Sequence, residues 1–150
     1  MSSNTIRSFQ PADLDRVCDI ERSSFPFPWS TLMFIQQHHM NPDGFFVAIR
    51  SGKLIGYVIA RLEGKTGHLL NLAVDPRFRC QGVGRALAEF IIDRLRKEGA
   101  EEVWLEVRIS NHVARAFYSA LGFKEEGIAK KYYLSEDAII MTKKLLHQNL

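Results

Sequence analysis

The sequence has few cysteines and no long apolar run. Two cysteines, Cys18 and Cys80, among 150 residues build no disulfide framework, and no cysteine–histidine cluster has the spacing of zinc ligands, so no metal is expected. No apolar stretch approaches the length that crosses a membrane, and the opening residues MSSNTIRSF lack the apolar core of a signal peptide. Repeats, low-complexity tracts and linkers are absent as well. The sequence therefore predicts one domain over residues 1–150, in the cytoplasm, without a membrane partner.

Composition and charge are those of a soluble globular protein. The chain is 46% hydrophobic and 25% charged, with a formal net charge of +3 and a pI near 9.0. This mild positive charge suits an acidic ligand or work close to nucleic acid, but it is too small to indicate a direct nucleic-acid site.

Hydrophobic periodicity and turn signals predict an α/β (α+β) chain with a mixed sheet. Helices are expected over 10–24, 30–40, 83–99 and 111–123, and strands over 5–9, 45–50, 54–62, 67–74, 102–108 and 137–146. Ser30 is the expected N-cap of the second helix, and 51–53 is an expected hairpin turn. Because a hairpin joins antiparallel strands, the sheet is not purely parallel. Two helices are expected to bury an apolar stripe, which is Leu87, Ala88, Ile91 and Leu95 in one and Val113, Ala116, Phe117, Ala120 and Leu121 in the other.

Arg79, Gly82 and Gly84 form an R-x-x-G-x-G pattern between a strand and a long helix. Glycines there let backbone N–H groups approach a ligand closely, and a helix N-terminus attracts anions, so the pattern indicates a phosphate-binding loop. The Lys-Ser/Thr that ends a nucleotide-hydrolysing P-loop is missing, and Leu87 occupies the place of the third glycine of a dinucleotide-binding motif. Two interpretations of the pattern remain: a loop whose backbone amides hold a pyrophosphate, and a turn that merely needs glycine.

Two polar residues follow, one in the next strand and one in the next helix. Glu106 interrupts the apolar strand VWLEVR, and burial there raises a carboxylate pKa, which makes it a candidate general base. The alternatives are an ion pair with Arg108 and an outward-facing edge position. Tyr118 lies on a polar stripe with Asn111 and Arg115, and it is a candidate proton donor or else an amphipathic residue at the edge of the core.

The segments LNLAVDPRFRCQGVGRAL, WLEVRISN and ARAFYSALGF, in this order and spacing, resemble the GCN5-related N-acetyltransferase (GNAT) family. Within it, the sequence is similar to the branch of bacterial ribosomal-protein alanine acetyltransferases and archaeal N-terminal acetyltransferases. The similarity extends from QPADL through FPWS to YYLSEDAIIM and so covers nearly the whole chain. It implies the GNAT fold, with a mostly antiparallel sheet of about seven strands splayed at its centre and flanked by about four helices. It also implies acetyl-CoA as the acetyl donor.

The resemblance also implies which residues act. In such enzymes the pyrophosphate lies on the loop before a long helix, the pantetheine pairs with strand backbone where the sheet splays open, and an asparagine contacts the cofactor arm. The matching positions here are Leu72, Ala73, Val74, Arg79, Cys80, Gln81, Gly82, Val83, Gly84, Arg85, Asn111 and Tyr118. Tyr118 is then expected beside the thioester sulfur, and Glu106 falls on the position of the base. His68 falls on that of a second proton-handling residue in some relatives, the alternative being a strand-start histidine that faces solvent.

The chemistry of amine acetylation suits these residue types. A free α-amine has a pKa of about 8 and must lose a proton to attack, whereas a lysine, at about 10.4, is harder to deprotonate. Glu106, ordinarily at about 4.3, is a weak base unless its pKa is raised or a water relays the proton, and His68, at about 6.5, is better matched. A tyrosine at about 10 can protonate a thiolate at about 8.5, and backbone N–H groups can stabilise the oxyanion.

The expected acceptor is the α-amine of a protein N-terminus, such as that of a ribosomal protein. Phe25, Pro26 and Phe27 match residues that build part of the peptide pocket, and Tyr132 and Tyr133 match residues that line the peptide's path. Some relatives that prefer acidic or small polar termini carry a glutamate at the position of Phe27, so Ala, Ser or Met termini are expected here. The alternatives are that FPFPW only packs the helix junction, that the acceptor is a lysine or a small amine, or that the chain is a non-catalytic acetyl-CoA-binding subunit.

Overall fold

The computed structural model describes residues 4–133 and 136–145, and it describes the side chains of these residues except those of 131–133. Its contacts group into two compact units. Unit 1 is built from Met1–Arg61 and Asn71–Ile91, and unit 2 from Leu62–Leu70 and Ile92–Leu150. No helix in the described part of the chain is both long and apolar enough to cross a membrane.

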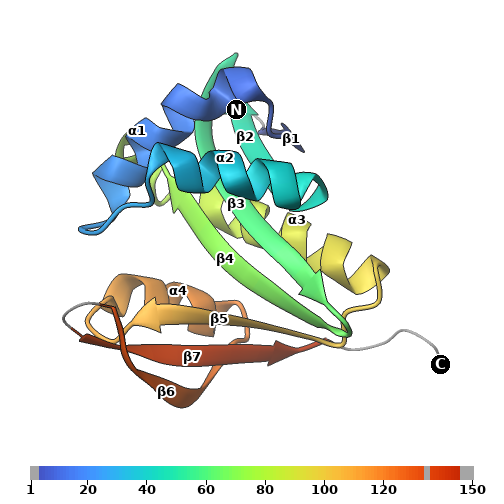
Figure 1. Cartoon of the computed structure of the whole chain (residues 1–150), viewed down its shortest axis with the longest axis vertical. Helices are drawn as coiled ribbons and strands as arrows, with labels where there is room; N and C mark the ends of the chain where they lie inside the picture. Colours follow the sequence, from blue (N-terminus) through green and yellow to red (C-terminus); the bar gives the residue numbers. More distant parts are fainter. Residues whose placement is uncertain (1–3, 134–135, 146–150) are drawn as a thin grey trace. The chain divides into compact units, whose positions relative to one another are not determined.

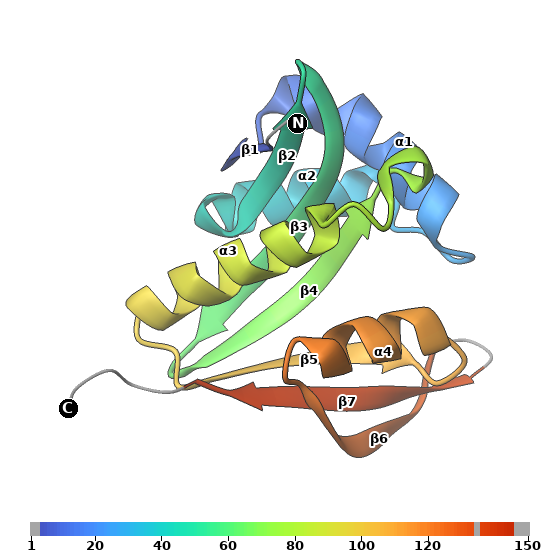
Figure 2. The ribbon, with the colours of Figure 1, turned by 180° about the vertical axis from the view of Figure 1, so that it is seen from behind.

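Unit 1 combines antiparallel strands with helices on both of their faces. It contains β1 (Thr5–Ser8), β2 (Phe45–Arg50), most of β3 (Lys53–Glu63), the second half of β4 (Thr66–Val74), α1 (Leu14–Ser24), α2 (Thr31–Met40) and the first part of α3 (Val83–Lys97). β1 pairs with β2 and β2 with β3, both antiparallel. Within this unit, α1 and α2 lie against one face of the strands (Figure 1) and α3 lies against the other (Figure 2).

Local signals position these elements as the sequence predicts. Ser30 caps α2, since its hydroxyl accepts the Met33 N–H at 3.2 Å. The β2–β3 turn places Ser51 and Gly52 at positive φ, 51° and 77°, the backbone that a tight hairpin requires. The helix expected from residue 10 begins with a 3-10 turn at Pro11–Asp13 and becomes α-helical at Leu14. The predicted cap and hairpin are confirmed.

The core of unit 1 is aromatic between the helices and the strands. Phe9 stacks on Phe45 with ring centroids 4.0 Å apart, and the ring of Phe34 meets the edge of Tyr57 at 5.7 Å. Phe34, Phe45 and Tyr57 are fully buried, so they contribute the largest burial of any side chains between these layers. The predicted stripe of α3 is buried as well, comprising Leu87, Ala88, Ile91 and Leu95.

Unit 2 is a small, mostly antiparallel sheet with α4 and the end of α3. It contains β5 (Glu102–Arg108), α4 (His112–Ala120), β6 (Lys124–Tyr133) and β7 (Glu136–Lys144), together with the first half of β4. β7 pairs antiparallel with β5 on one side and with β6 on the other. The first residues of β4 pair parallel with β5, from Thr66 opposite Glu102 to His68 opposite Trp104.

Together the strands follow the order β1-β2-β3-β4-β5-β7-β6 in one seven-stranded, mostly antiparallel sheet, with four α-helices in the described chain. The expected fold class is confirmed. Two local expectations are wrong. β6 was not predicted as a strand, because this edge strand pairs only with β7 and its sequence, KEEGIAKKYY, shows no apolar alternation. The predicted core face of α4 is correct at Leu121, which is buried, but wrong at Val113, which is 83% exposed, and at the exposed Ala116 and Ala120. Tyr118, which was not predicted on this face, is buried.

Candidate active site

A buried histidine–carboxylate pair lies between β4 and β5 in unit 2. The Nε2 atom of His68 is 2.7 Å from Oε1 of Glu106, and the two side chains are 8% and 7% exposed. The strand register explains the contact, since His68 is opposite Trp104 and Glu106 is two residues further along the same face of β5. Glu106 pairs with Ile140 of β7, and on the other side the pairing of β5 with β4 ends at Trp104, opposite His68. His68 is buried and does not face solvent.

The pair is held in place on more than one side. The rings of His68 and Trp104 stack, with centroids 3.8 Å apart and an interplanar angle of 11°. Nδ1 of His68 is buried, and it has no hydrogen-bond partner among the described residues. Arg108, the other expected partner of Glu106, forms an ion pair with Glu136 at 2.8 Å. The imidazole is therefore fixed by stacking and by one hydrogen bond, with its second nitrogen left for another group.

Tyr118 lies in the same unit, on α4. It is 8% exposed, and its ring meets the edges of Phe117 and Phe123 at 5.0 and 5.6 Å. Asn111 caps the helix, because its side-chain oxygen accepts the Ala114 N–H at 3.1 Å. The expected polar stripe is divided, since Arg115 pairs with Glu125 on the surface at 2.8 Å. Tyr118 is thus a packed residue with a polar tip, as both of its sequence interpretations require.

The R-x-x-G-x-G segment, in unit 1, forms an exposed loop that leads into α3. Gly82 has a φ of 84° and Cys80 a φ of 60°, so the loop turns through two left-handed residues before α3 begins at Val83. Arg79 ties the loop to its surroundings, as its guanidinium donates to the Val74 carbonyl at 3.1 Å and to the Ser24 hydroxyl at 2.9 Å. A strand, a turn with glycine at positive φ and a helix N-terminus follow one another, which is the arrangement that suits a phosphate group.

The strand before this loop approaches its neighbour closely. Leu72, Ala73 and Val74 form the end of β4, and a Cβ added at Gly56 on β3 would lie 3.0 Å from the Ala73 carbonyl oxygen.

Sequence reasoning missed the next residue, Asp75, a buried carboxylate that accepts the Arg77 N–H at 2.9 Å.

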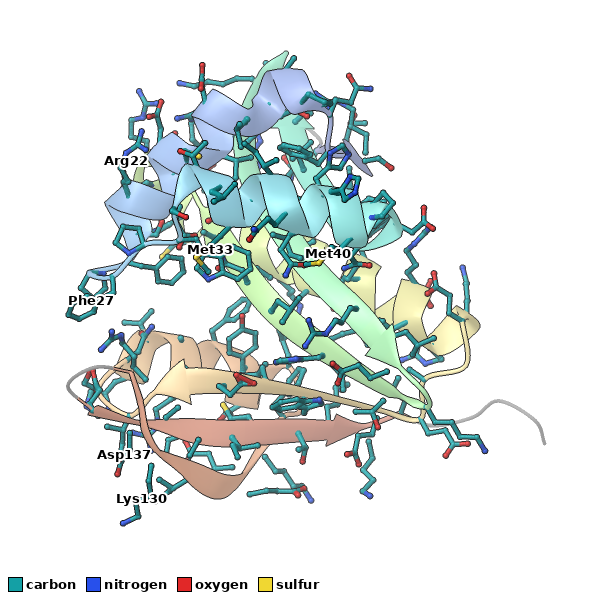
Figure 3. All side chains as sticks on the ribbon, in the orientation of Figure 1. Arg22, Phe27, Met33, Met40, Lys130 and Asp137 are labelled. Atoms are coloured by element: carbon teal, nitrogen blue, oxygen red, sulfur yellow. The ribbon has the colours of Figure 1, made fainter. Side chains whose placement is uncertain are left out.

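The segment between α1 and α2 carries the expected acceptor-binding residues. Phe27 is 53% exposed at the tip of this loop (Figure 3), and Pro26 is exposed as well. Trp29 turns inward and packs on Phe34, with ring centroids 5.1 Å apart. Trp29, the last residue of FPFPW, therefore packs the helix junction, and about half of Phe27 is exposed. The side chains of Tyr132 and Tyr133, expected on the peptide's path, lie outside the described residues.

Glu21, on α1, is a second buried carboxylate, to which sequence reasoning gave helical spacing but no role. It is only 2% exposed, and its carboxylate accepts hydrogen bonds from the side chains of Tyr57 and Asn71 and from the Trp29 N–H. The signal was available, because Glu21 continues the buried α1 stripe of Val17 and Cys18 at helical spacing. A charged residue on a core stripe indicates a buried polar network.

No group of three or more histidine, cysteine, aspartate or glutamate side chains within the described residues could hold a metal ion. The candidate functional groups among the described residues are the His68–Glu106 pair, Tyr118, the glycine loop and the α1–α2 segment.

Comparison with known proteins identifies the family. The sequence model of the acetyltransferase (GNAT) family matches residues 14–123. The ribosomal protein bS18-alanine N-acetyltransferase of Escherichia coli K12 is 41% identical over 145 residues, covering 92% of this chain and 95% of that protein. The crystal structure of Ard1 from Thermoplasma volcanium has a TM-score of 0.91 at 31% identity, covering 96% of this chain and 99% of that chain. That of the ribosomal-protein-S18-alanine N-acetyltransferase from Escherichia coli has a TM-score of 0.85 at 38% identity, covering 99% of both chains. The chain is an acyltransferase that belongs to the GNAT family.

Proposed function

We propose that the chain, acting as one domain in the cytoplasm, transfers the acetyl group of acetyl-CoA to the α-amine of protein N-termini of the Ala, Ser or Met type, such as that of a ribosomal protein. The observation that carries this proposal is the buried His68–Glu106 pair in a chain 41% identical to a ribosomal protein bS18-alanine N-acetyltransferase. The sequence pI near 9.0 is in keeping with work near the ribosome.

The reaction is a direct attack. The nitrogen of the neutral α-amine attacks the thioester carbonyl carbon, the carbon–sulfur bond breaks, and the amine's proton passes to the enzyme. His68 and Glu106 are joined by one hydrogen bond between Nε2 and Oε1, and they accept this proton as a pair. Because Nδ1 of His68 is buried, the proton reaches the pair through the Glu106 carboxylate or through a water. Tyr118 protonates the leaving thiolate.

The donor-binding part of the proposal rests on unit 1, with Asn111 added from unit 2. The backbone of Leu72, Ala73 and Val74 pairs with the pantetheine arm, and the loop from Arg79 to Arg85 holds the pyrophosphate, with Gly82 allowing the close approach of its amides. Asn111 contacts the cofactor arm through the side-chain amide, whose oxygen also caps α4. The exposed loop at a helix N-terminus fits such an anion.

The acceptor-binding part rests on the α1–α2 segment. Phe25, Pro26 and the exposed Phe27 give it an apolar, uncharged surface, which suits a small or apolar first residue better than a cation. Tyr132 and Tyr133 are proposed to line the path of the peptide backbone.

Mass spectrometry of peptides incubated with the protein and acetyl-CoA tests the function. The peptides differ in their first residue, and each carries one internal lysine. We expect acetylation of the α-amine, fastest on Ala, Ser or Met. Acetylation of the lysine alone would indicate a lysine or small-amine acetyltransferase, and acetyl-CoA binding without any transfer would indicate a non-catalytic subunit; either result contradicts the proposal.

Substitution of two of the three proposed proton-transfer residues tests the mechanism. Glu106→Gln and Tyr118→Phe are each expected to lower kcat by about 10²–10⁴-fold, the usual contribution of general acid–base groups, and to leave the Kd for acetyl-CoA within a few-fold. Glu102→Gln is the matched control, since Glu102 lies on the same strand and pairs with Lys144 at the surface. Turnover of both variants at the wild-type rate would show that the chemistry is wrongly assigned.

A further inference from the structure

We propose that Glu21 is the residue that positions the acceptor segment, defined here as residues 25–29, and that its carboxylate thereby sets the affinity for the acceptor peptide. This inference rests on the proposed function. Its support is a set of contacts that lie wholly within unit 1.

The acceptor segment is attached to Glu21 at both ends. At its start, the Phe25 N–H donates to the Glu21 carbonyl oxygen at 3.1 Å, and at its end the Trp29 N–H donates to Oε2 of the Glu21 carboxylate at 2.8 Å. Pro26 and Pro28 have no N–H to donate, so the backbone between these points has few ways to be held. One residue therefore closes the loop that carries Phe27.

The carboxylate that holds Trp29 is itself fixed. Oε1 of Glu21 accepts from the hydroxyl of Tyr57, which is fully buried, and from Nδ2 of Asn71 at 2.8 Å. Burial, and then the neighbouring Glu21 charge, raise the pKa of Tyr57 well above its usual value, so its hydroxyl stays protonated and keeps donating. Three neutral donors thus converge on a carboxylate that is only 2% exposed. An acceptor surrounded in this way cannot move without losing several hydrogen bonds.

The same carboxylate also reaches the proposed donor strand. Asn71 directly precedes Leu72, the first of the three residues proposed to pair with the pantetheine arm. Glu21 therefore touches the acceptor segment through Trp29 and β4 through Asn71. This arrangement fixes the segment to the strand beside which the thioester is proposed to lie.

Glu21→Gln is the direct test, because glutamine keeps the volume of the side chain but turns an NH₂ group toward one of the three donors. We expect the KM for an acceptor peptide to rise about 10-fold, as the loss of one hydrogen bond to a charged group predicts. The KM for acetyl-CoA and kcat should stay within about twofold. Amide hydrogen exchange of residues 25–30 should become faster, which reports on the loop without depending on activity.

Two controls separate positioning from a general loss of stability. Asp19→Asn removes a carboxylate from the same helix, where Asp19 is exposed and pairs with Arg22, and it should behave like the wild type. Tyr57→Phe removes a donor on the core side of Glu21 but leaves the contact with Trp29. It should lower Tm and raise the peptide KM by less than Glu21→Gln does.

The inference is overturned if Glu21→Gln leaves the peptide KM and the exchange of residues 25–30 unchanged, or if Tyr57→Phe raises the peptide KM as much as Glu21→Gln does. Its failure differs from a failure of the proposed function. If wild-type protein acetylates α-amines and Glu21→Gln has an unchanged peptide KM, only the positioning role falls. If the wild type acetylates another amine, the proposed function is wrong. Faster exchange of residues 25–30 in Glu21→Gln, together with a raised KM for that amine, would still support the positioning role.

Discussion

Asp75 is a buried carboxylate at the turn that follows β4. Its oxygens accept the side chain and the N–H of Arg77 and also the side chain of Arg16, from α1. Hydrogen bonds from the Arg77 side chain, and then those from its backbone and from Arg16, lower the pKa of Asp75 well below its usual range despite its burial. One residue therefore links α1 to the end of the proposed donor strand.

Asp75→Asn should lower the free energy of unfolding by about 1–3 kcal/mol at neutral pH, because its partners lose a charged acceptor. A group whose pKa is depressed in the folded state stabilises it above the unfolded-state pKa, about 3.9, and this contribution disappears as the pH falls through the folded-state value. The difference between wild type and variant in urea unfolding should thus be largest near neutrality and shrink below about pH 4.

Asp93→Asn is the control for this measurement. Asp93 pairs with Arg96 and Lys97 on the surface of α3, where solvent screens an ion pair and leaves it little net effect on stability. Equal effects of the two substitutions at all pH values would contradict the role given to Asp75.

Single residues were predicted from the sequence where local context was enough. Glu106 drew attention as a polar residue in an apolar strand and His68 through the family resemblance, and the structure brings them together. Asp75 was missed, and Glu21 was recognised only by its helical spacing, because their hydrogen-bond partners are distant in the sequence. The partner is Arg16 for Asp75, and the partners are Tyr57 and Asn71 for Glu21. A linear pattern contains no information on such pairs until the strands are placed.

The start of β2 and the end of β3 approach so closely that a side chain does not fit at Gly44. A Cβ there would lie 1.9 Å from the Ala60 carbonyl oxygen, which also accepts from Nδ2 of Asn41 at 2.8 Å. Gly44→Ala should therefore destabilise the protein by about 1–3 kcal/mol or more, because backbone must shift to make room. Thermal unfolding followed by circular dichroism measures the effect.

Gly127→Ala on β6 serves as the comparison. A Cβ there would meet only the side-chain end of Ile140, at 3.9 Å, so this variant should unfold within about 0.5 kcal/mol of the wild type. If Gly44→Ala is as stable as Gly127→Ala, the close approach of the two strands is wrong.

At the scale of elements, the sequence predicted those whose pattern matches their burial. β2 to β5 and α3 carry apolar residues where the core requires them. β6 was not predicted because it is a strand through its pairing with β7, and its composition gives no strand signal. In α4 the periodicity offered two adjacent stripes, and the one that is buried includes Tyr118 and not Val113, since apolar residues are common on surfaces.

Two elements run through both compact units. β4 contributes its first half to unit 2 and its second half to unit 1, and α3 passes from unit 1 into unit 2 at Ile92. A unit that unfolds alone would have to break a continuous strand and a continuous helix. We therefore expect urea to unfold the whole molecule in one cooperative transition.

The two tryptophans allow this to be measured, since Trp29 lies in unit 1 and Trp104 in unit 2. Fluorescence of Trp104→Phe reports on unit 1 through Trp29, and that of Trp29→Phe on unit 2. In each variant the fluorescence transition should coincide with that of far-UV circular dichroism, which reports on both units together. A fluorescence transition clearly separate from the circular dichroism transition in either variant would mean that the units unfold independently.

Glu21 holds the 25–29 segment by main-chain groups at both ends, and this has a consequence for evolution and engineering. Neither anchor depends on which side chains stand at positions 25 and 27, so these two residues are free to diverge while the loop keeps its course. A library randomised at Phe25 and Phe27, with Glu21 and both prolines retained, should therefore yield mostly folded enzymes that differ in the first residue they prefer.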